Sequence, residues 1–378
     1  MGLRVAAVRA RRALTGHQRY KGSAEDILRA GLEACWYGEF LTASPGTYRH
    51  FWTRDLGFAA PALMRLGSPW PERLSSSLAW ALDTWRRRGS RVTTTIDPVF
   101  RAPVDVFDYG VDSLPLLVSS LRALGAAAEP LVGEHADWLA AEVDHFVTQV
   151  VDPATGLVRA DRHLSSHRDT FKGGSTAYGN TMVALLARDI VETGWGPDLL
   201  SGHFRVDGGA PDWSLLLRRH FWRGGRFRDR IGSAAMSGEA NVWPFHAGLT
   251  DDRSMLTAAL ETLGRDGYTT PYPLKFEVDH RRDGQLWAFR AWASDYQTTT
   301  SWTSLGSIYL SLLRTLDPAA ARLELGRMRE LVERDGTFWE VLDSRGRPWR
   351  SASRLSVSDT SMLWGAILLV LLEEDAER

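Results

Sequence analysis

The chain has 378 residues and nearly equal charge, with 45 basic and 46 acidic side chains. This balance excludes the strongly basic surface that nucleic acid or an anionic membrane requires, so a neutral polar ligand is the better fit. The one cysteine, Cys35, excludes an internal disulfide and a cysteine-based zinc site, which suits a reducing compartment.

The first residues, MGLRVAAVRARRALTG, are basic, and four arginines interrupt any apolar core of signal-peptide length. Residues 1–20 are therefore expected to form an arm or a frayed end. The apolar run 362–372 is too short for a bilayer, which needs about 20 residues, so it is interpreted as a core helix. Together with the lone cysteine, these features predict a cytoplasmic protein.

Helical periodicity dominates the chain, as in 24–40, 113–125, 137–151 and 307–316, and strand-like alternation is rare. Loops rich in Gly, Ser, Thr and aromatic residues run into apolar helices at six places. These junctions are Asp55, Asp112, Tyr178, Asn241, Ser301 and Asp359, separated by 57, 66, 63, 60 and 58 residues. Such regular spacing indicates a repeat.

Each interval can hold two helices and two loops. The second helix of each pair is expected at 24–40, 71–88, 134–151, 212–222, 251–263 and 317–334. Twelve helices in six pairs predict an all-α (α/α)6 toroid of six inner and six outer helices. No linker divides it, so residues 1–378 are expected to form one domain, with a short β-hairpin excursion near 275–292.

In such a toroid the six junction loops meet at one end and line one cavity, where helix N-termini favour carboxylates. Several of the 16 tryptophans stand beside polar residues in these loops, a pattern typical of sugar stacking, although core packing accounts for about half of them equally well. The histidines are scattered, with only His163 and His167 as a near pair, so no metal site is expected. No nucleotide motif is present, and no cofactor is expected.

Glycoside hydrolysis needs a protonated carboxyl group and an ionised one. Asp112 in DYGVDSLPLL is the candidate acid, because Tyr109, Val111 and the following apolar run would desolvate it. The alternative is a plain helix N-cap. Glu340 in TFWEVLDSRG is the candidate base, with an exposed loop glutamate as the alternative and Glu239 in SGEANVWPF as a rival.

The order of WTRD, a VDS motif and a late glutamate resembles the inverting (α/α)6 glycoside hydrolases, namely glycogen-debranching glucosidases, glucosidase-I-like enzymes and alkaline/neutral invertases. The resemblance implies Asp112 as general acid and Glu340 as general base. It further implies a sugar site in three segments, WTRD, HRDTFKGG and YQTTTSWTSLG. Their candidate residues are Trp52, Arg54, Asp55, Arg168, Asp169, Lys172, Tyr296, Gln297 and Trp302. Residues beside the motifs complete the predicted site: Tyr109, Glu239, Asn241, Trp243 and Trp339.

Two departures from the family pattern bear on the substrate: Pro115 replaces an aromatic residue after the acid, and HRDT lacks the tryptophan of the family's DWMD segment. The N-terminal sandwich domain of many relatives is not found either, which favours small sugars over branched polymers. The resemblance thus predicts an inverting hydrolase of a small, neutral, α-linked sugar, with the two carboxyls about 6.5–9.5 Å apart. It also predicts that Asp112→Asn removes turnover with little loss of stability.

Other functions remain open on the same barrel. A sugar epimerase would need histidines in the cavity, and only His246 lies near a junction. A phosphorylase would depend on phosphate, and a lyase would need a basic groove that the net charge of −1 disfavours. A non-catalytic sugar-binding protein is the alternative from another class.

Overall fold

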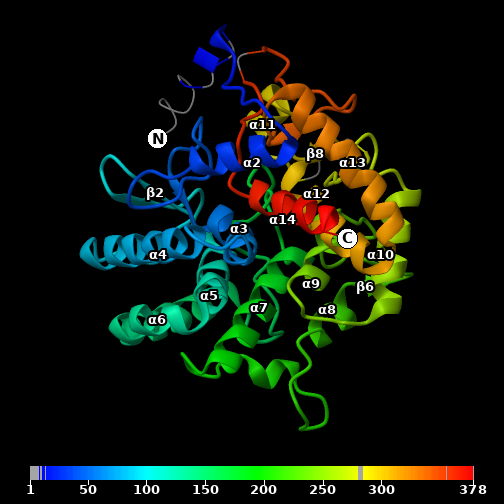
Figure 1. The fold of residues 1–378 in the computed structure, drawn as a ribbon. Coiled ribbons are helices and arrows are strands. Elements are labelled where there is room, and N and C mark those ends of the chain that lie inside the picture. Colours follow the sequence, from blue (N-terminus) through cyan, green and yellow to red (C-terminus); the bar gives the residue numbers. More distant parts are fainter. Residues whose placement is uncertain (1–7, 9–10, 13, 280–283, 355, 378) are drawn as a thin grey trace.

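In the computed structural model, which describes residues 8, 11–12, 14–279, 284–354 and 356–377, pairs of helices form a ring (Figure 1). The inner helices are α3 (Thr53–Arg65), α5 (Ser113–Leu124), α7 (Ala177–Thr193), α9 (Trp243–His246), α12 (Thr303–Leu316) and α14 (Gly365–Ala376). The outer helices are α2 (Ala24–Glu33), α4 (Trp70–Arg87), α6 (Glu129–Val150), α8 (Leu215–His220), α10 (Arg253–Arg265) and α13 (Pro318–Asp335). The predicted all-α toroid is confirmed.

Burial separates the two sets of helices. In α7 every residue from 177 to 190 is buried, and α14 is buried from 365 to 372, because neighbouring helices cover these inner helices on all sides. The outer helices α4 and α13 instead bury one stripe and expose the opposite face, as expected for amphipathic surface helices. The contrast explains why the inner helices read as continuous apolar runs.

The junction loops are held by very short strands. β1 (Phe51–Trp52) pairs with β2 (Thr95–Asp97), which pairs with β3 (Ala102–Val104). β4 (Tyr109–Gly110) lies parallel to β5 (Leu164–Ser165), and β8 (Ser301–Trp302) is antiparallel to β9 (Val341–Leu342). A separate hairpin joins β6 (Trp222–Arg223) to β7 (Arg226–Phe227). Three of these ladders stand directly before or beside an inner helix, so each fixes where that helix begins.

Neighbouring inner helices pack closely, and the last pair closes the ring. A Cβ atom on Gly57 of α3 would lie 2.5 Å from the Cβ atom of Leu116 on α5, so only glycine permits this approach. α14 packs against both α2 and α3. The seam between the sixth and first repeats is therefore a packed interface.

Two details differ from the sequence prediction. The helix expected over 24–40 ends at Glu33, because the chain turns at Ala34 and Trp36 pairs with Leu41. The hairpin expected near 275–292 does not form as predicted: its turn includes residues outside the described part, Gln285 pairs with Phe171, and 287–292 is a short helix, α11 (Trp287–Trp292). Of the arm expected over 1–20, residues 1–7, 9–10 and 13 also lie outside the described part.

One helical stretch, Ser113–Val150, is long and apolar enough to cross a membrane by length and composition. It comprises α5 and α6 joined by the 3-10 turn η1 (Gly125–Ala128), and both helices belong to the ring. Core helices of soluble proteins satisfy the same criterion, so the stretch gives no support for a membrane span.

Candidate functional site

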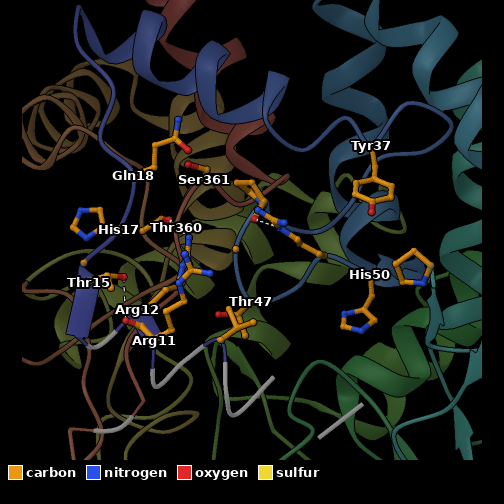
Figure 2. A pocket seen from close by; sticks show the side chains of 16 residues that line it. Arg11, Arg12, Thr15, His17, Gln18, Tyr37, Thr47, His50, Thr360 and Ser361 are labelled. Carbon is orange, nitrogen blue, oxygen red and sulfur yellow. Dashed lines mark hydrogen bonds between the residues drawn. The ribbon is translucent and has the colours of Figure 1, made fainter. Parts of the chain in front are cut away.

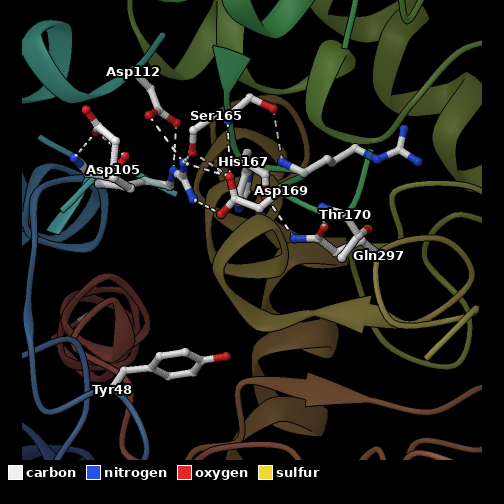
Figure 3. A network of polar contacts seen from close by, with 12 residues as sticks. Tyr48, Asp105, Asp112, Ser165, His167, Asp169, Thr170 and Gln297 are labelled. Carbon is white, nitrogen blue, oxygen red and sulfur yellow. Dashed lines mark hydrogen bonds and ion pairs between the residues drawn. The ribbon is translucent and has the colours of Figure 1, made fainter. Parts of the chain in front are cut away.

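Arg54, in the first turn of α3, joins two carboxylates from different repeats (Figure 3). Its Nε lies 2.6 Å from Oδ2 of Asp112, and its Nη1 lies 3.0 Å from Oδ2 of Asp169. The guanidinium side chain is only 7% exposed. One buried cation therefore balances one of two neighbouring acids, and the cluster retains a surplus carboxylate.

Asp112 is fully buried, at 0% exposure, and both of its oxygens are engaged. Oδ1 accepts from Nη2 of Arg54 at 3.3 Å, and Oδ2 also accepts from the Tyr178 hydroxyl at 2.8 Å. Asp112 is the residue before α5, but its side chain makes no capping hydrogen bond. The expected burial is present, whereas the expected apolar surroundings are replaced by an ion pair.

Asp169 belongs to the same cluster and is the more accessible acid, with 21% of its side chain exposed. Its Oδ1 accepts from the Ser165 hydroxyl at 2.7 Å and from the Ser166 amide at 3.2 Å. The loop that carries it is clamped by Gln297, whose amide accepts from the Thr170 N–H at 2.8 Å and donates to the backbone carbonyl of His167 at 3.0 Å. Asp169 is thus held in place while part of its carboxylate faces outward.

Glu340 stands directly before β9 and is 2% exposed. Its Oε1 accepts from the Tyr296 hydroxyl at 2.6 Å, and its Oε2 accepts from the backbone N–H of Asp359 at 3.0 Å. The Tyr48 hydroxyl lies 3.2 Å from that of Tyr296, and Figure 3 shows Tyr48 set apart from the Asp112 and Asp169 cluster. Glu340 is therefore positioned by two donors rather than free in a loop.

Asp55 links the two carboxylate groups electrostatically. The pKa of Asp55 is raised to about 7, chiefly by burial and in smaller part by the charges of Glu340 and Asp169, which Arg54 opposes. Asp169 lies in the loop before α7 and Glu340 in the loop that leads to α14, so both lie at the end of the barrel where the inner helices begin. The repeat pattern predicts that the junction loops meet at this end.

A second buried cluster adjoins the one around Arg54 (Figure 3). Nδ1 of His167 is 3.5 Å from Oε2 of Glu239, and Nη2 of Arg168 is 2.8 Å from Oε1 of Glu277. Burial raises the pKa of Glu239 to about 8 and lowers that of His167 to about 3, so both side chains are mainly uncharged near neutral pH. Arg168 also stacks over Phe171. Glu239 and Arg168 therefore serve internal contacts.

The tryptophans near the site differ in what their indole groups do. Trp302 donates to the backbone carbonyl of Tyr296 at 2.7 Å, so it supports the residue that holds Glu340. Trp339 donates to Asp335 at 2.7 Å and packs against His17. The indole N–H groups of Trp52 and Trp243 are buried and have no hydrogen-bond partner among the described residues.

Three predicted residues stand apart from the carboxylates. The Asn241 amide is used by the backbone of Phe227, and Tyr109 packs against His145 and Phe146 rather than toward Asp112. Lys172 is exposed and pairs through its backbone with Gly284. Within the described part of the chain, the structure gives these three side chains no contact with Arg54, Asp169 or Glu340.

Sequence reasoning missed Ser165, Tyr178 and Asp359, which hydrogen-bond to the candidate acids, and Tyr48, whose hydroxyl lies beside that of Tyr296. Tyr178 and Asp359 were already recognisable as junctions of the repeat, so that pattern could have nominated them. Tyr48 and Ser165 carry no signal of their own, because they reach the site only through tertiary contacts.

Among the described residues, one group has the separation of a metal site, comprising Asp83, Glu134 and His135 on the outer helices. Arg86 contacts Nδ1 of His135, and Arg87 pairs with Asp83. The positive charges of these two guanidinium groups disfavour the binding of a metal cation at this position.

Sequence comparison finds no matching family model and no matching curated protein. Similar solved structures do exist. A protein described as a glycosidase has 16% identity and a TM-score of 0.63, with coverage of 94% of this chain and 97% of that chain. The GH63 mannosylglycerate hydrolase of Thermus thermophilus, solved with Tris and D-glycerate, has 14% identity, a TM-score of 0.61 and coverage of 93% and 100%. The chain has the fold of the (α/α)6 glycosidases.

A rhamnosidase from Klebsiella oxytoca, solved with rhamnose, shares the (α/α)6 glycosidase fold at 13% identity and a TM-score of 0.63, with coverage of 93% of this chain and 63% of that chain. A variant of the first glycosidase has been solved in complex with glucose. These (α/α)6 glycosidases thus bind different sugars on one scaffold.

The buried Glu239 of this (α/α)6 glycosidase fold should give stability a distinct pH dependence. Its folded pKa of about 8 exceeds the ordinary value of 4.5, so the folded state holds the extra proton between these pH values. The contribution of Glu239 therefore favours folding below about pH 4.5 and is lost as pH rises toward 8. Glu239→Gln has no carboxyl group to titrate, so its free energy of unfolding relative to the parent should rise by on the order of 3 kcal/mol between pH 5 and 8.

Urea unfolding of both proteins across this pH range measures the difference. Glu261→Gln, an exposed change on α10, is the control and should follow the parent at every pH. A difference in unfolding free energy between Glu239→Gln and the parent that does not change with pH would contradict the prediction.

Proposed function

We propose that the protein is a glycoside hydrolase that cleaves a small α-linked, glucosidic sugar by a single displacement with inversion. The observation that carries this proposal is a pair of carboxylates with separate partners: Arg54 and Ser165 hold Asp169, and Tyr296 and the Asp359 amide hold Glu340. The likeness to the (α/α)6 glycosidases supports the same class. An acid that protonates the leaving oxygen and a base that activates water are what inversion requires.

Glu340 is the proposed base. Hydrogen bonds from Tyr296 and from the Asp359 amide favour its ionised form, because both groups donate to the carboxylate. The rival, Glu239, has a pKa raised to about 8 by burial, so it is mainly protonated at neutral pH and cannot accept a proton from water. The geometry thus supports Glu340 over Glu239.

The proposed acid comes from the cluster around Arg54. Asp112 remains the candidate of the family resemblance, but it is 0% exposed, and Arg54 and Tyr178 engage its carboxylate. Asp169 is partly exposed and shares the same cation. Asp169 is the member of the pair that a bound glycosidic oxygen can reach, because part of its side chain is exposed. We therefore favour Asp169 as the donor and Asp112 as the anchor of Arg54.

A specific observation supports a second substrate class, a sugar linked to a small carboxylate. A pocket of about 340 Å³ lies beside the Asp359 loop and is lined by Arg11, Arg12, His17, Arg49 and His50, with no acidic side chain among the described residues of its lining (Figure 2). The mannosylglycerate hydrolase of the same fold was solved with D-glycerate. A cationic pocket near the site would suit such an anionic leaving group.

The test is release of monosaccharide from a panel of α-linked sugars. It comprises maltose, isomaltose, kojibiose, trehalose, sucrose, glucosylglycerate and mannosylglycerate, each with and without phosphate. We expect phosphate-independent hydrolysis of one of them, and proton NMR of the first product should show the anomer opposite to that of the substrate. Product with retained configuration would overturn the single displacement.

Other outcomes select the alternatives. Turnover that needs phosphate would identify a phosphorylase, and conversion of a free sugar to its isomer would identify an epimerase. Sugar binding in calorimetry, with no product from any member of the panel, would support a non-catalytic sugar-binding protein.

A further inference from the structure

We propose that Arg12, from the segment before the first helix of the ring, is a positioning residue that holds Asp359 and, through it, the base Glu340. This inference rests on the proposed function, because it assigns Arg12 a part in the work of Glu340. The two residues are 328 positions apart in the sequence, and no motif connects them.

Arg12 is inserted into the barrel rather than lying on its surface. Its side chain is 16% exposed, Nη1 forms an ion pair with Oδ1 of Asp359, and Nη2 donates to the Thr360 hydroxyl at 3.2 Å. The guanidinium also occupies the space beside Gly46 in which any Cβ atom would stand. Figure 2 shows Arg12 next to Thr47 and Thr360 on the wall of the pocket.

Asp359 needs this cation. It is 1% exposed, and its Oδ2 accepts from the Ser44 hydroxyl at 2.5 Å and from the Thr47 amide at 2.9 Å. These donors are neutral, so of these contacts only the ion pair with Arg12 supplies a compensating positive charge. A buried carboxylate that loses its cation becomes strongly unfavourable.

Two main-chain hydrogen bonds tie Asp359 to the base. The Asp359 N–H donates to Oε2 of Glu340 at 3.0 Å, and the Glu340 N–H donates to the Asp359 carbonyl at 2.9 Å. Any shift of the Asp359 backbone therefore moves the Glu340 carboxylate. Arg12 and Glu340 also interact electrostatically, so the guanidinium favours the ionised base.

The experiment compares Arg12→Gln, Arg12→Lys and the parent on a neutral substrate that the parent cleaves, so that contact with an anionic leaving group plays no part. Lys21→Gln, an exposed cation in the same segment, is the matched control. In Arg12→Gln we expect kcat to fall about ten- to a hundredfold with KM little changed. The acidic limb of the pH profile should move up by about 1 unit, since the base loses a favourable cation.

Arg12→Lys should return the limb toward its parental position, whereas Lys21→Gln should leave both kcat and the limb unchanged. A profile of Arg12→Gln that superimposes on the parent, or an equal shift in Lys21→Gln, would overturn the inference. A lower melting temperature alone, without a shifted limb, would show that Arg12 is only structural.

The carboxyl titration of Glu340 gives a readout that needs no turnover. Its signal in protein labelled with ¹³C at glutamate Cδ is assigned by its loss in Glu340→Gln. We expect the titration in Arg12→Gln to move to higher pH. If Glu340→Gln retains parental turnover, the proposed base is wrong. If Glu340→Gln is inactive while the Arg12 variants keep the parental titration, only the role of Arg12 is refuted.

Discussion

Replacement of Glu340 by glutamine should reduce turnover by about 10²- to 10⁴-fold while the protein remains folded. Glutamine preserves the shape of the side chain, and its amide oxygen can still accept from Tyr296 or from the Asp359 amide, which now hold the carboxylate at 2.6 and 3.0 Å. It cannot accept a proton from water. Initial rates on the best substrate of the panel, together with thermal melting curves, measure both parts of the prediction.

Azide or formate offers a sharper test of Glu340. A small anion that enters the space vacated by a shortened Glu340→Ala side chain can replace the base, so it should restore part of the turnover of that variant. Glu330→Gln, an exposed change on α13, is the matched control and should keep parental rates with or without the anion. Parental turnover in Glu340→Gln would exclude the residue as base.

Asp169→Asn should mainly reduce turnover, whereas Asp112→Asn should mainly reduce stability. Asp169 is partly exposed, so its amide variant should lose about 10²- to 10⁴-fold in turnover with little change in melting temperature. Asp112 is completely buried against Arg54, so its amide variant leaves a buried cation with less compensation. We expect about 3 kcal/mol lower stability for Asp112→Asn, in contrast to the near-normal stability that the sequence alone predicts.

Substrates with different leaving groups distinguish the two aspartates. An activated aryl glycoside needs little protonation of its leaving group, so Asp169→Asn should cleave it at a rate much closer to the parental rate than it cleaves a disaccharide. A variant that has lost activity through misfolding should be slow on both substrates. Asp108→Asn, an exposed change in the loop before Asp112, serves as the control. Rescue of Asp112→Asn but not of Asp169→Asn would return the acid role to Asp112.

The repeat spacing predicted the ring of helices because inner helices must be apolar over their whole circumference. Residues 177–190 and 365–372 are buried without interruption, and such runs recur at nearly constant intervals. The outer helix predicted at 212–222 is observed as the six-residue α8. Local pattern is therefore a good guide to helices whose length and burial are both large.

The site was only partly predictable, because a motif gives the identity of an acid but not its neighbours. Asp112, Asp169 and Arg54 were all nominated, yet nothing in the sequence indicated that one guanidinium would hold both acids. The contact of Arg12 with Asp359 joins segments 347 residues apart. Such contacts depend on how the ring closes, and the spacing of apolar residues along the chain does not predict them.

Closure of the ring brings together residues of the proposed site from the first and the last repeats. Arg54 and Asp55 lie in the first inner helix, whereas Glu340 and Asp359 lie in the loops around the last, and α14 meets α2 and α3 only at the seam. The packing of α14 against α2 and α3 therefore sets how Arg54 and its partner Asp169 are placed relative to Glu340. A local opening of this one seam should therefore separate the two parts of the proposed site even if every helix of the ring stays folded.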